Sequence, residues 1–210
     1  MKKVIILSFV FVNTMFAALC QEDKFTAAMT ATLEHMKAAK TAEETAEVAA
    51  KFERIADAEK TQWLPYYYAA LIKAQLAFGA TDKDKAADEA TILLDKASAI
   101  SKDNSEIYCV RATICYAHMM VDPMSRWMQY GGEATKNLAA SKKADATNPR
   151  PYILEANSLK NTPEQFGGGC ATAKPAAEKA AKMLIEFKPA SSLHPIWGKE
   201  IIDQILEGCK

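Results

Sequence analysis

The feature that most constrains the fold of this chain is an internal repeat of small and large side chains. Tyr66, Tyr108 and Tyr152 each have an alanine four residues later, at Ala70, Ala112 and Ala156. A second pattern precedes each tyrosine by 18, 14 and 11 residues: Ala90, Leu94 and Ala97; Ala134, Leu138 and Ser141; and, more loosely, Val48, Phe52 and Ile55. Spacings of three and four predict helices, and small residues at fixed offsets let two antiparallel helices approach closely. We therefore expect pairs of helices that stack to bury their apolar surface.

Composition and turn residues also favour helices. Alanine is abundant, whereas the chain of 210 residues has only 8 glycines and 8 prolines, and alanine loses no side-chain entropy in a helix. Asn148 suits a helix N-cap and Pro149 the first turn, while Asn104 or Ser105 can cap the equivalent helix. The predicted helices span about 22–40, 43–60, 64–79, 84–101, 105–120, 123–146, 149–160, 171–188 and 196–208.

The alternation of an aromatic–small helix with a small–large–small helix resembles the tetratricopeptide repeat (TPR) family over residues 41–190. This resemblance implies an all-α fold, a TPR-like α-solenoid of antiparallel helix pairs. The tyrosines lie 42 and 44 residues apart, whereas the family repeat is about 34 residues. The excess falls in lengthened loops inside each pair, at 79–85, 121–132 and 161–170. Insertions at matching points lie along one edge of such an array.

The ends of a stacked array need covering elements, because an open end exposes its core. We expect residues 21–60 to form N-terminal capping helices, and residues 61–210 to form the TPR-like array with a C-terminal capping helix. That last helix is predicted to bury its apolar residues, which are Ile196, Trp197, Ile201, Ile202 and Ile205.

The first twenty residues predict export. Lys2 and Lys3 precede an apolar stretch and small residues, which is the layout of a signal peptide over residues 1–20, with cleavage after Cys20. The alternative is a lipid anchor at Cys20, for which Leu19 is a poor preceding residue. No later segment has the roughly 18 uninterrupted apolar residues of a membrane span. We expect a periplasmic or secreted protein that has no membrane span.

Charge and cysteine content narrow the possible partners. Lys and Arg number 26, as do Asp and Glu, so loss of Lys2 and Lys3 leaves a net charge of −2. Such a chain lacks the basic footprint of a nucleic-acid binder. Four cysteines remain after the signal, and they allow three pairings. We favour Cys170 with Cys209 and expect Cys109 and Cys115 to be buried free thiols.

The TPR resemblance also implies a groove. In that family the first helices of the pairs form the concave face, and the register assigns to it Tyr67, Leu71, Gln75, Glu106, Cys109, Thr113, Tyr116, Arg150, Ile153, Asn157 and Lys160. This mixture of aromatic, polar and charged groups suits a peptide or a small ligand; the alternative is a solvated face without a ligand. The candidate ligand or partner groove is Tyr67, Gln75, Glu106, Thr113, Tyr116, Arg150, Asn157 and Lys160.

The loop at 161–170 has three consecutive glycines directly before a helix. Backbone N–H groups there could bind an anion with Lys174 nearby. Alternatively, the glycines supply unusual dihedral angles and Phe166 plugs the core. The Thr-Pro-Glu-x-Phe-Gly-Gly segment resembles loops of exported TPR-type proteins of Gram-negative bacteria, and some of these are periplasmic partners of solute transporters.

The methionine and histidine patterns argue against a metal site and against catalysis. The methionines near His118, which are Met119, Met120, Met124 and Met128, have no repeated Met-x-x-Met spacing, and methionine commonly fills gaps in a core. The three histidines, His35, His118 and His194, have no catalytic or zinc-binding sequence context. We therefore predict no catalytic residues, no metal site and no cofactor.

The function expected from these patterns is a non-enzymatic, exported helical-repeat scaffold that mediates protein–protein interaction in the cell envelope. The alternative is a small-solute or lipid-binding helical-repeat protein associated with a periplasmic transporter. That alternative rests on the long loops and on Trp127 and Tyr130 within one of them.

Overall fold

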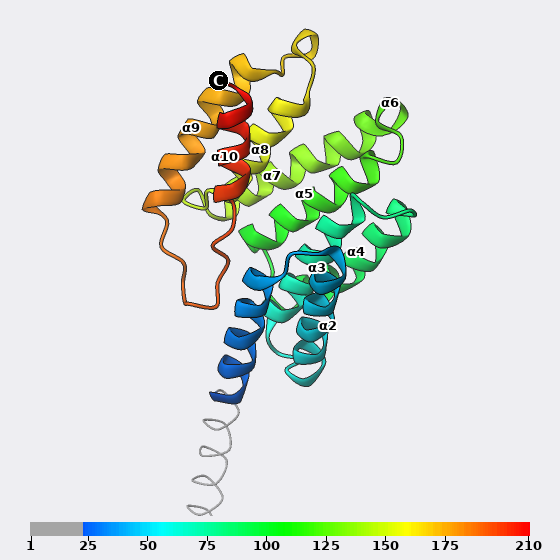
Figure 1. The fold of residues 1–210 in the computed structure, drawn as a ribbon, viewed down its shortest axis with the longest axis vertical. Coiled ribbons are helices and arrows are strands. Elements are labelled where there is room, and N and C mark those ends of the chain that lie inside the picture. The colour runs from blue at the N-terminus through cyan, green and yellow to red at the C-terminus, as the bar shows by residue number, and fades with distance from the viewer. Residues whose placement is uncertain (1–22) are drawn as a thin grey trace, which may run out of the picture.

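The computed structural model describes residues 23–210, which are all-α, contain no strand and pack in sequential pairs of helices (Figure 1). The predicted signal peptide, its cleavage site and the alternative anchor at Cys20 lie outside the described residues. The helices are 23–38, α2 (Ala42–Ala58), α3 (Trp63–Ala77), α4 (Lys83–Ile100), α5 (Ser105–Met119), α6 (Pro123–Arg126), α7 (Gly132–Ala144), α8 (Arg150–Asn161), α9 (Cys170–Glu186) and α10 (Lys199–Gly208). Within this range, no helix has the length and apolar character needed to cross a membrane.

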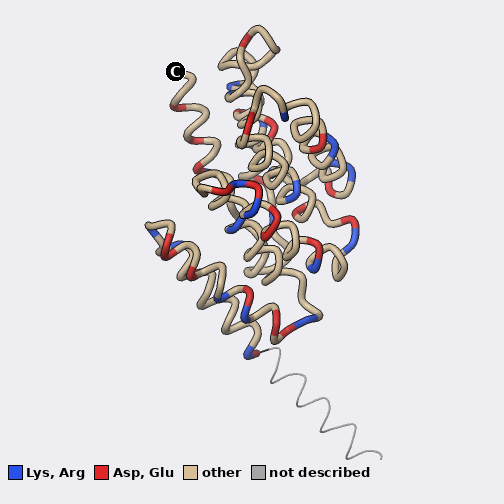
Figure 2. The backbone as a smooth tube through the Cα atoms, turned by 90° about the vertical axis from the view of Figure 1, so that its right-hand side faces the viewer, with Lys and Arg blue, Asp and Glu red and all other residues tan. Residues whose placement is uncertain are grey.

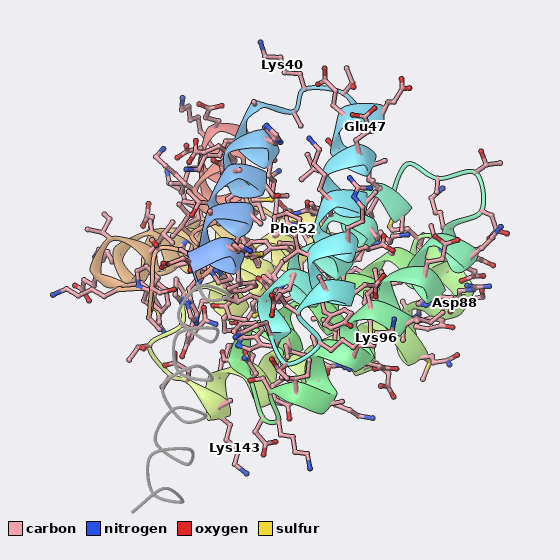
Figure 3. The ribbon with its side chains drawn as sticks, turned by 90° about the horizontal axis from the view of Figure 1, so that it is seen from below. Lys40, Glu47, Phe52, Asp88, Lys96 and Lys143 are labelled. Carbon is pink, nitrogen blue, oxygen red and sulfur yellow. A yellow bond between two sulfur atoms is a disulfide. The ribbon has the colours of Figure 1, made fainter. Side chains whose placement is uncertain are left out.

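The first two helices, 23–38 and α2, form a hairpin on one end of the molecule. Thr41 begins α2 with a capping box: its hydroxyl accepts from the Glu44 N–H, and the Glu44 carboxylate accepts from the Thr41 N–H. Figure 3 shows Phe52 between the two helices, where it is fully buried and stacks on Tyr68 of α3 at 5.0 Å. The capping role of residues 21–60 stays a prediction.

The small residues of the repeat lie where consecutive helices meet. The pairs are α3 with α4, α5 with α7 and α8 with α9. The alanines at the repeat positions have no exposed surface: Ala70, Ala90, Ala97, Ala112, Ala134 and Ala156. Leu94 is also fully buried, and Leu138 is 5% exposed. The repeat therefore correctly predicted which side chains form the contacts between helices.

The three repeat tyrosines stand near the starts of α3, α5 and α8. Lys96 lies over the ring of Tyr66 at 5.5 Å, and Lys142 and Lys179 lie over the ring of Tyr152 at 4.7 and 4.9 Å. Tyr108 differs, because its hydroxyl donates to Asp103.

The lengthened loops follow α3, α5 and α8, as expected. Figure 1 shows these three connections along the same side of the molecule. Figure 2 shows basic and acidic residues interspersed along the helices.

The predicted helix at 123–146 is wrong as a continuous helix. α6 is followed by a π-helical turn, Trp127–Gly131, before α7. Arg126 donates to both oxygens of Asp84, and Tyr130 stacks on His118 at 5.0 Å. Hydrogen bonds from Arg126 and His118 hold the pKa of Asp84 at about 2. These contacts tie the inserted segment to α4 and α5. The π-helical turn changes the direction of the side chains around it, so Arg126 and Tyr130 can both reach these neighbours.

Two more predictions are corrected near the loops. The last helix begins at Lys199 and not at 196, because Gly198 has a φ of +126° that does not continue a helix. Ile196 is consequently 63% exposed, and Trp197 lies in the connection. Phe166 is 75% exposed and does not plug the core.

The predicted disulfide between Cys170 and Cys209 is confirmed, and it joins the start of α9 to the end of α10. Cys109 is a buried free thiol, as expected, and Cys115 is a half-buried one.

Gly198 provides the first test. A Cβ at this position would lie 2.4 Å from Cδ1 of the buried Ile153, and its φ is unfavourable for any side chain. We expect Gly198→Ala to lower the free energy of unfolding by about 1–3 kcal/mol, as measured by urea denaturation. In the control Gly132→Ala, the added Cβ meets nothing within 4 Å, and the variant should be unchanged or about 0.5–1 kcal/mol more stable. Equal midpoints for Gly198→Ala and the wild type would contradict the prediction.

Candidate functional site

A pocket of about 260 Å³ lies where the inner sides of α3, α5 and α8 meet α10 and the segment before it. Four predicted groove residues line it: Gln75, Thr113, Tyr116 and Asn157. The remaining lining residues are Leu71, Phe78, Met119, Met120, Leu154, Ser158, Asn161, Thr162, Trp197 and Ile201.

The pocket wall combines apolar side chains with neutral polar groups. None of the described residues that line it carries a charge. Burial raises the pKa of the Tyr116 phenol, and a hydrogen bond with Ser158 opposes this shift. Tyr116 is therefore a neutral phenol at neutral pH. Such walls suit a mostly apolar ligand that carries a few groups able to form hydrogen bonds.

Three other predicted groove residues, Tyr67, Glu106 and Arg150, do not line this pocket. They lie beneath residues 187–198, a segment between α9 and α10 that we call the strap. Arg150 has no exposed surface, and its Nη1 donates to Glu106 Oε1 at 2.8 Å. Its Nη2 donates to the carbonyl oxygen of Pro195 in the strap. The chain's own strap thus covers this half of the inner face.

Aromatic groups enclose the buried ion pair. The Arg150 guanidinium lies 4.9 Å from the Phe187 ring centre and 5.5 Å from that of Trp197. Arg150 Nε is buried and has no hydrogen-bond partner among residues 23–210. Because a buried ion must be compensated, removal of either charged partner should strongly destabilise the fold.

Two tyrosines of α3 connect this network to the strap. The Tyr67 hydroxyl donates to Glu106 Oε2 at 3.2 Å and accepts from Trp197 Nε1 at 2.8 Å. The Tyr68 hydroxyl donates to the carbonyl oxygen of Leu193 at 2.8 Å. Burial raises the pKa of both phenols. Burial also raises the pKa of Glu106 to about 7, although Arg150 opposes the shift.

Lys160, the eighth predicted residue, lies outside the pocket lining. It stands on α8 three residues after Asn157, and its side chain extends towards Gly208. The assignment of the eight residues to a binding site stays a prediction.

Sequence reasoning missed the contribution of α10 and the strap. Trp197 and Ile201 were predicted to be capping residues, yet both line the pocket. Trp197 contacts Tyr67 across 130 residues of sequence, and no local pattern signals such a contact.

A second cavity of about 280 Å³ lies on the other side of the strap, and Trp63, Glu106, Asp145, Lys188 and His194 are among its lining residues.

The backbone conformation of the loop at 161–170 explains its three consecutive glycines. Gly167 and Gly169 have φ values of +85° and +82°, and a Cβ at Gly168 would lie 2.0 Å from the Thr162 carbonyl oxygen. Among residues 23–210, no group of three or more His, Cys, Asp or Glu side chains could hold a metal ion.

Glu106 generates a pH prediction. Its pKa is raised from the ordinary 4.5 to about 7 on folding, so the folded state binds the proton more tightly than the unfolded state. The stability that this proton provides is fully present below about 4.5 and is lost as the pH rises through about 7. The unfolding free energy of the wild type, minus that of Glu106→Gln, should fall as the pH rises over this range in urea titrations. A difference that grows with pH would mean that Arg150 lowers the pKa of Glu106 by more than burial raises it.

Comparison with known proteins identifies a relative. No family model matches the chain, and no curated protein matches it. Among solved structures, the chain is similar to the HusA haemophore from Porphyromonas gingivalis, with 35% sequence identity and a TM-score of 0.79. The match covers 89% of this chain and 92% of that chain. A haemophore relative agrees with the prediction of a non-enzymatic binding protein, and it favours the small-ligand alternative over the scaffold interpretation. The chain belongs to the family of the HusA haemophore.

Proposed function

We propose that this protein binds haem in the pocket between α3, α5, α8 and α10. Membership in the HusA haemophore family is the observation that carries the proposal. The apolar pocket on the inner face supports it independently of the comparison. The proposal also includes export, because the signal-peptide pattern of residues 1–20 agrees with a haemophore relative.

The pocket wall fits a flat, apolar macrocycle. Leu71, Leu154, Trp197 and Ile201 offer aliphatic and aromatic surface to the porphyrin face, and such burial stabilises by roughly 25 cal/mol per Å². At about 260 Å³, the pocket is slightly smaller than the ~300–1,000 Å³ usual for small-ligand sites. Haem would therefore be covered in part, with one edge of the ring left at the rim.

Direct ligation of the iron has few candidates here. Proteins hold haem iron through His, Cys, Met or Tyr, and the wall offers Tyr116, Met119 and Met120. His118 does not line the pocket. Its imidazole is hydrogen-bonded to Asp84 instead, with Nδ1 2.7 Å from the Asp84 carboxylate. The raised pKa of Tyr116 disfavours a phenolate ligand. Apolar contact with the ring is therefore expected to supply most of the binding free energy.

The propionates need polar partners at the rim. Asn157, Asn161 and Gln75 supply amide N–H donors. Lys160, on the same helix as the two asparagines, forms no ion pair within residues 23–210. We propose that its ammonium group approaches a propionate.

Protein–protein interaction is retained as a second candidate function because of one surface feature. Met124, Trp127 and Met128 lie at helical spacing on α6 and the π-helical turn and are 86%, 60% and 74% exposed. Apolar groups of this size on a surface favour contact with another protein. The TPR-like stacking of helix pairs is likewise proposed, on the strength of the buried alanines at the repeat positions.

A tryptophan at position 157 tests the location of the pocket. The indole of Asn157→Trp would fill the cavity from a half-buried helical position, so we expect haem affinity to fall about tenfold or more. Haem titration followed by the Soret absorbance measures the change. The control Glu155→Trp places the same ring on an exposed position of α8 that is not part of the pocket lining, and it should bind like the wild type. Unchanged affinity in Asn157→Trp would exclude this pocket.

Charge reversal at Lys160 tests the propionate contact. We expect Lys160→Glu to weaken haem binding about threefold to tenfold, with the loss shrinking at high salt, because the half-buried Lys160 still reaches solvent and its charge is screened by ions. Lys182→Glu on α9 is the control, since this exposed lysine lies on another helix. Equal effects of the two variants at every salt concentration would remove Lys160 from the site.

A further inference from the structure

We infer that Tyr67 is a positioning residue for the ligand: it holds Trp197 in place as a wall of the pocket without touching the ligand itself. This inference rests on the proposed function, because it concerns the same pocket. Tyr67 has no exposed surface and is absent from the pocket lining, whereas Trp197 is part of that lining.

The hydrogen bond between the two residues fixes the indole. Trp197 Nε1 donates to the Tyr67 hydroxyl at 2.8 Å. The indole N–H is a donor only, so its orientation depends on where an acceptor is placed. The Tyr67 hydroxyl is free to accept because its own proton is donated to Glu106 Oε2 at 3.2 Å.

Trp197 needs this support because it is not in a helix. It lies in the strap between the buried Pro195 and Gly198, two positions before α10 begins at Lys199. Its backbone therefore lacks the i to i−4 ladder that holds the other pocket elements, α3, α5, α8 and α10. Two side-chain contacts hold the Trp197 indole instead of helical backbone hydrogen bonds. They are the hydrogen bond to Tyr67 and the Arg150 guanidinium, 5.5 Å from the Trp197 ring centre.

Tyr67 is itself held rigidly. Its ring makes edge contacts with Trp63 at 5.5 Å and with Tyr68 at 5.2 Å. Its acceptor, Glu106, is fixed by Arg150 at 2.8 Å and by Asn148 at 3.0 Å. A continuous series of contacts thus runs from the buried ion pair through Tyr67 to the pocket wall. In this arrangement the predicted groove residues Tyr67, Glu106 and Arg150 support the pocket wall and do not contact the ligand directly.

Tyr67→Phe isolates the positioning bond. It keeps the ring and its packing but leaves the Trp197 N–H without its acceptor, so the wall is less preorganised for the ligand. Because one such hydrogen bond is worth about 0.5–1.5 kcal/mol, we expect haem affinity to fall about threefold to tenfold. Tyr68→Phe is the matched control, since it removes an equally buried phenol bonded to the same strap at Leu193 and not at Trp197.

The experiment is a Soret titration of haem into the full mature chain for the wild type, Tyr67→Phe, Tyr68→Phe, Trp197→Phe and the Tyr67→Phe/Trp197→Phe double variant. Tyr67→Phe should weaken binding, and Tyr68→Phe should not. In the Trp197→Phe background the tyrosine change should have no further effect, because the bond is already gone. Equal losses in both tyrosine variants, or an undiminished effect of Tyr67→Phe without Trp197, would overturn the inference.

A readout without haem separates this inference from the proposed function. The Trp197 indole N–H signal, assigned by its loss in Trp197→Phe, should shift and exchange faster with solvent in Tyr67→Phe but not in Tyr68→Phe. If the wild type binds no haem, the proposed function fails, and this signal alone decides the positioning role. An indole signal that Tyr67→Phe leaves unmoved overturns the inference whether or not haem binds.

Discussion

The buried ion pair between Arg150 and Glu106 organises the inner face of the molecule. An arginine with no exposed surface must have its charge compensated and its N–H groups bonded, because transfer of an ion from water to a protein interior is costly. Glu106 supplies the charge, and the Pro195 carbonyl supplies a further acceptor from the strap. The strap is therefore drawn across the inner face, where it covers one half and leaves the other half as the pocket.

This arrangement depends on how closely the helices approach one another. The fully buried alanines at the repeat positions remove side-chain bulk between consecutive helices, so α3, α5 and α8 can present their inner sides to a common space. The disulfide between Cys170 and Cys209 ties α9 to α10, and α10 contributes Ile201 to the pocket. Scaffold and site are thus coupled, since the same packing that stabilises the fold sets the spacing of the pocket walls.

The functional interpretation follows from the half of the inner face that stays open. Its walls combine apolar and neutral polar groups and carry no charge, which suits a small, mostly apolar molecule better than a charged peptide. The family relationship to a haemophore supports the same choice. The exposed apolar residues of α6 and the π-helical turn are a separate surface, held to the body by Arg126 and Tyr130. A ligand pocket and a surface for a partner can coexist on this fold.

The sequence by itself determined the all-α class, nearly every helix and the buried alanines, because these follow from spacing, capping and short-range packing along the chain. It favoured the Cys170–Cys209 pair but left three pairings open, and the structure decided between them. It also brought Gln75, Thr113, Tyr116 and Asn157 to one face through helical register. Only the tertiary structure decided that Tyr67, Glu106 and Arg150 lie beneath the strap while Trp197 and Ile201 form the wall. That outcome depends on contacts between residues up to 130 positions apart, and on a glycine dihedral angle that ends the connection before α10. Long-range contacts of this kind leave no periodic trace in the sequence, so local patterns could not predict them.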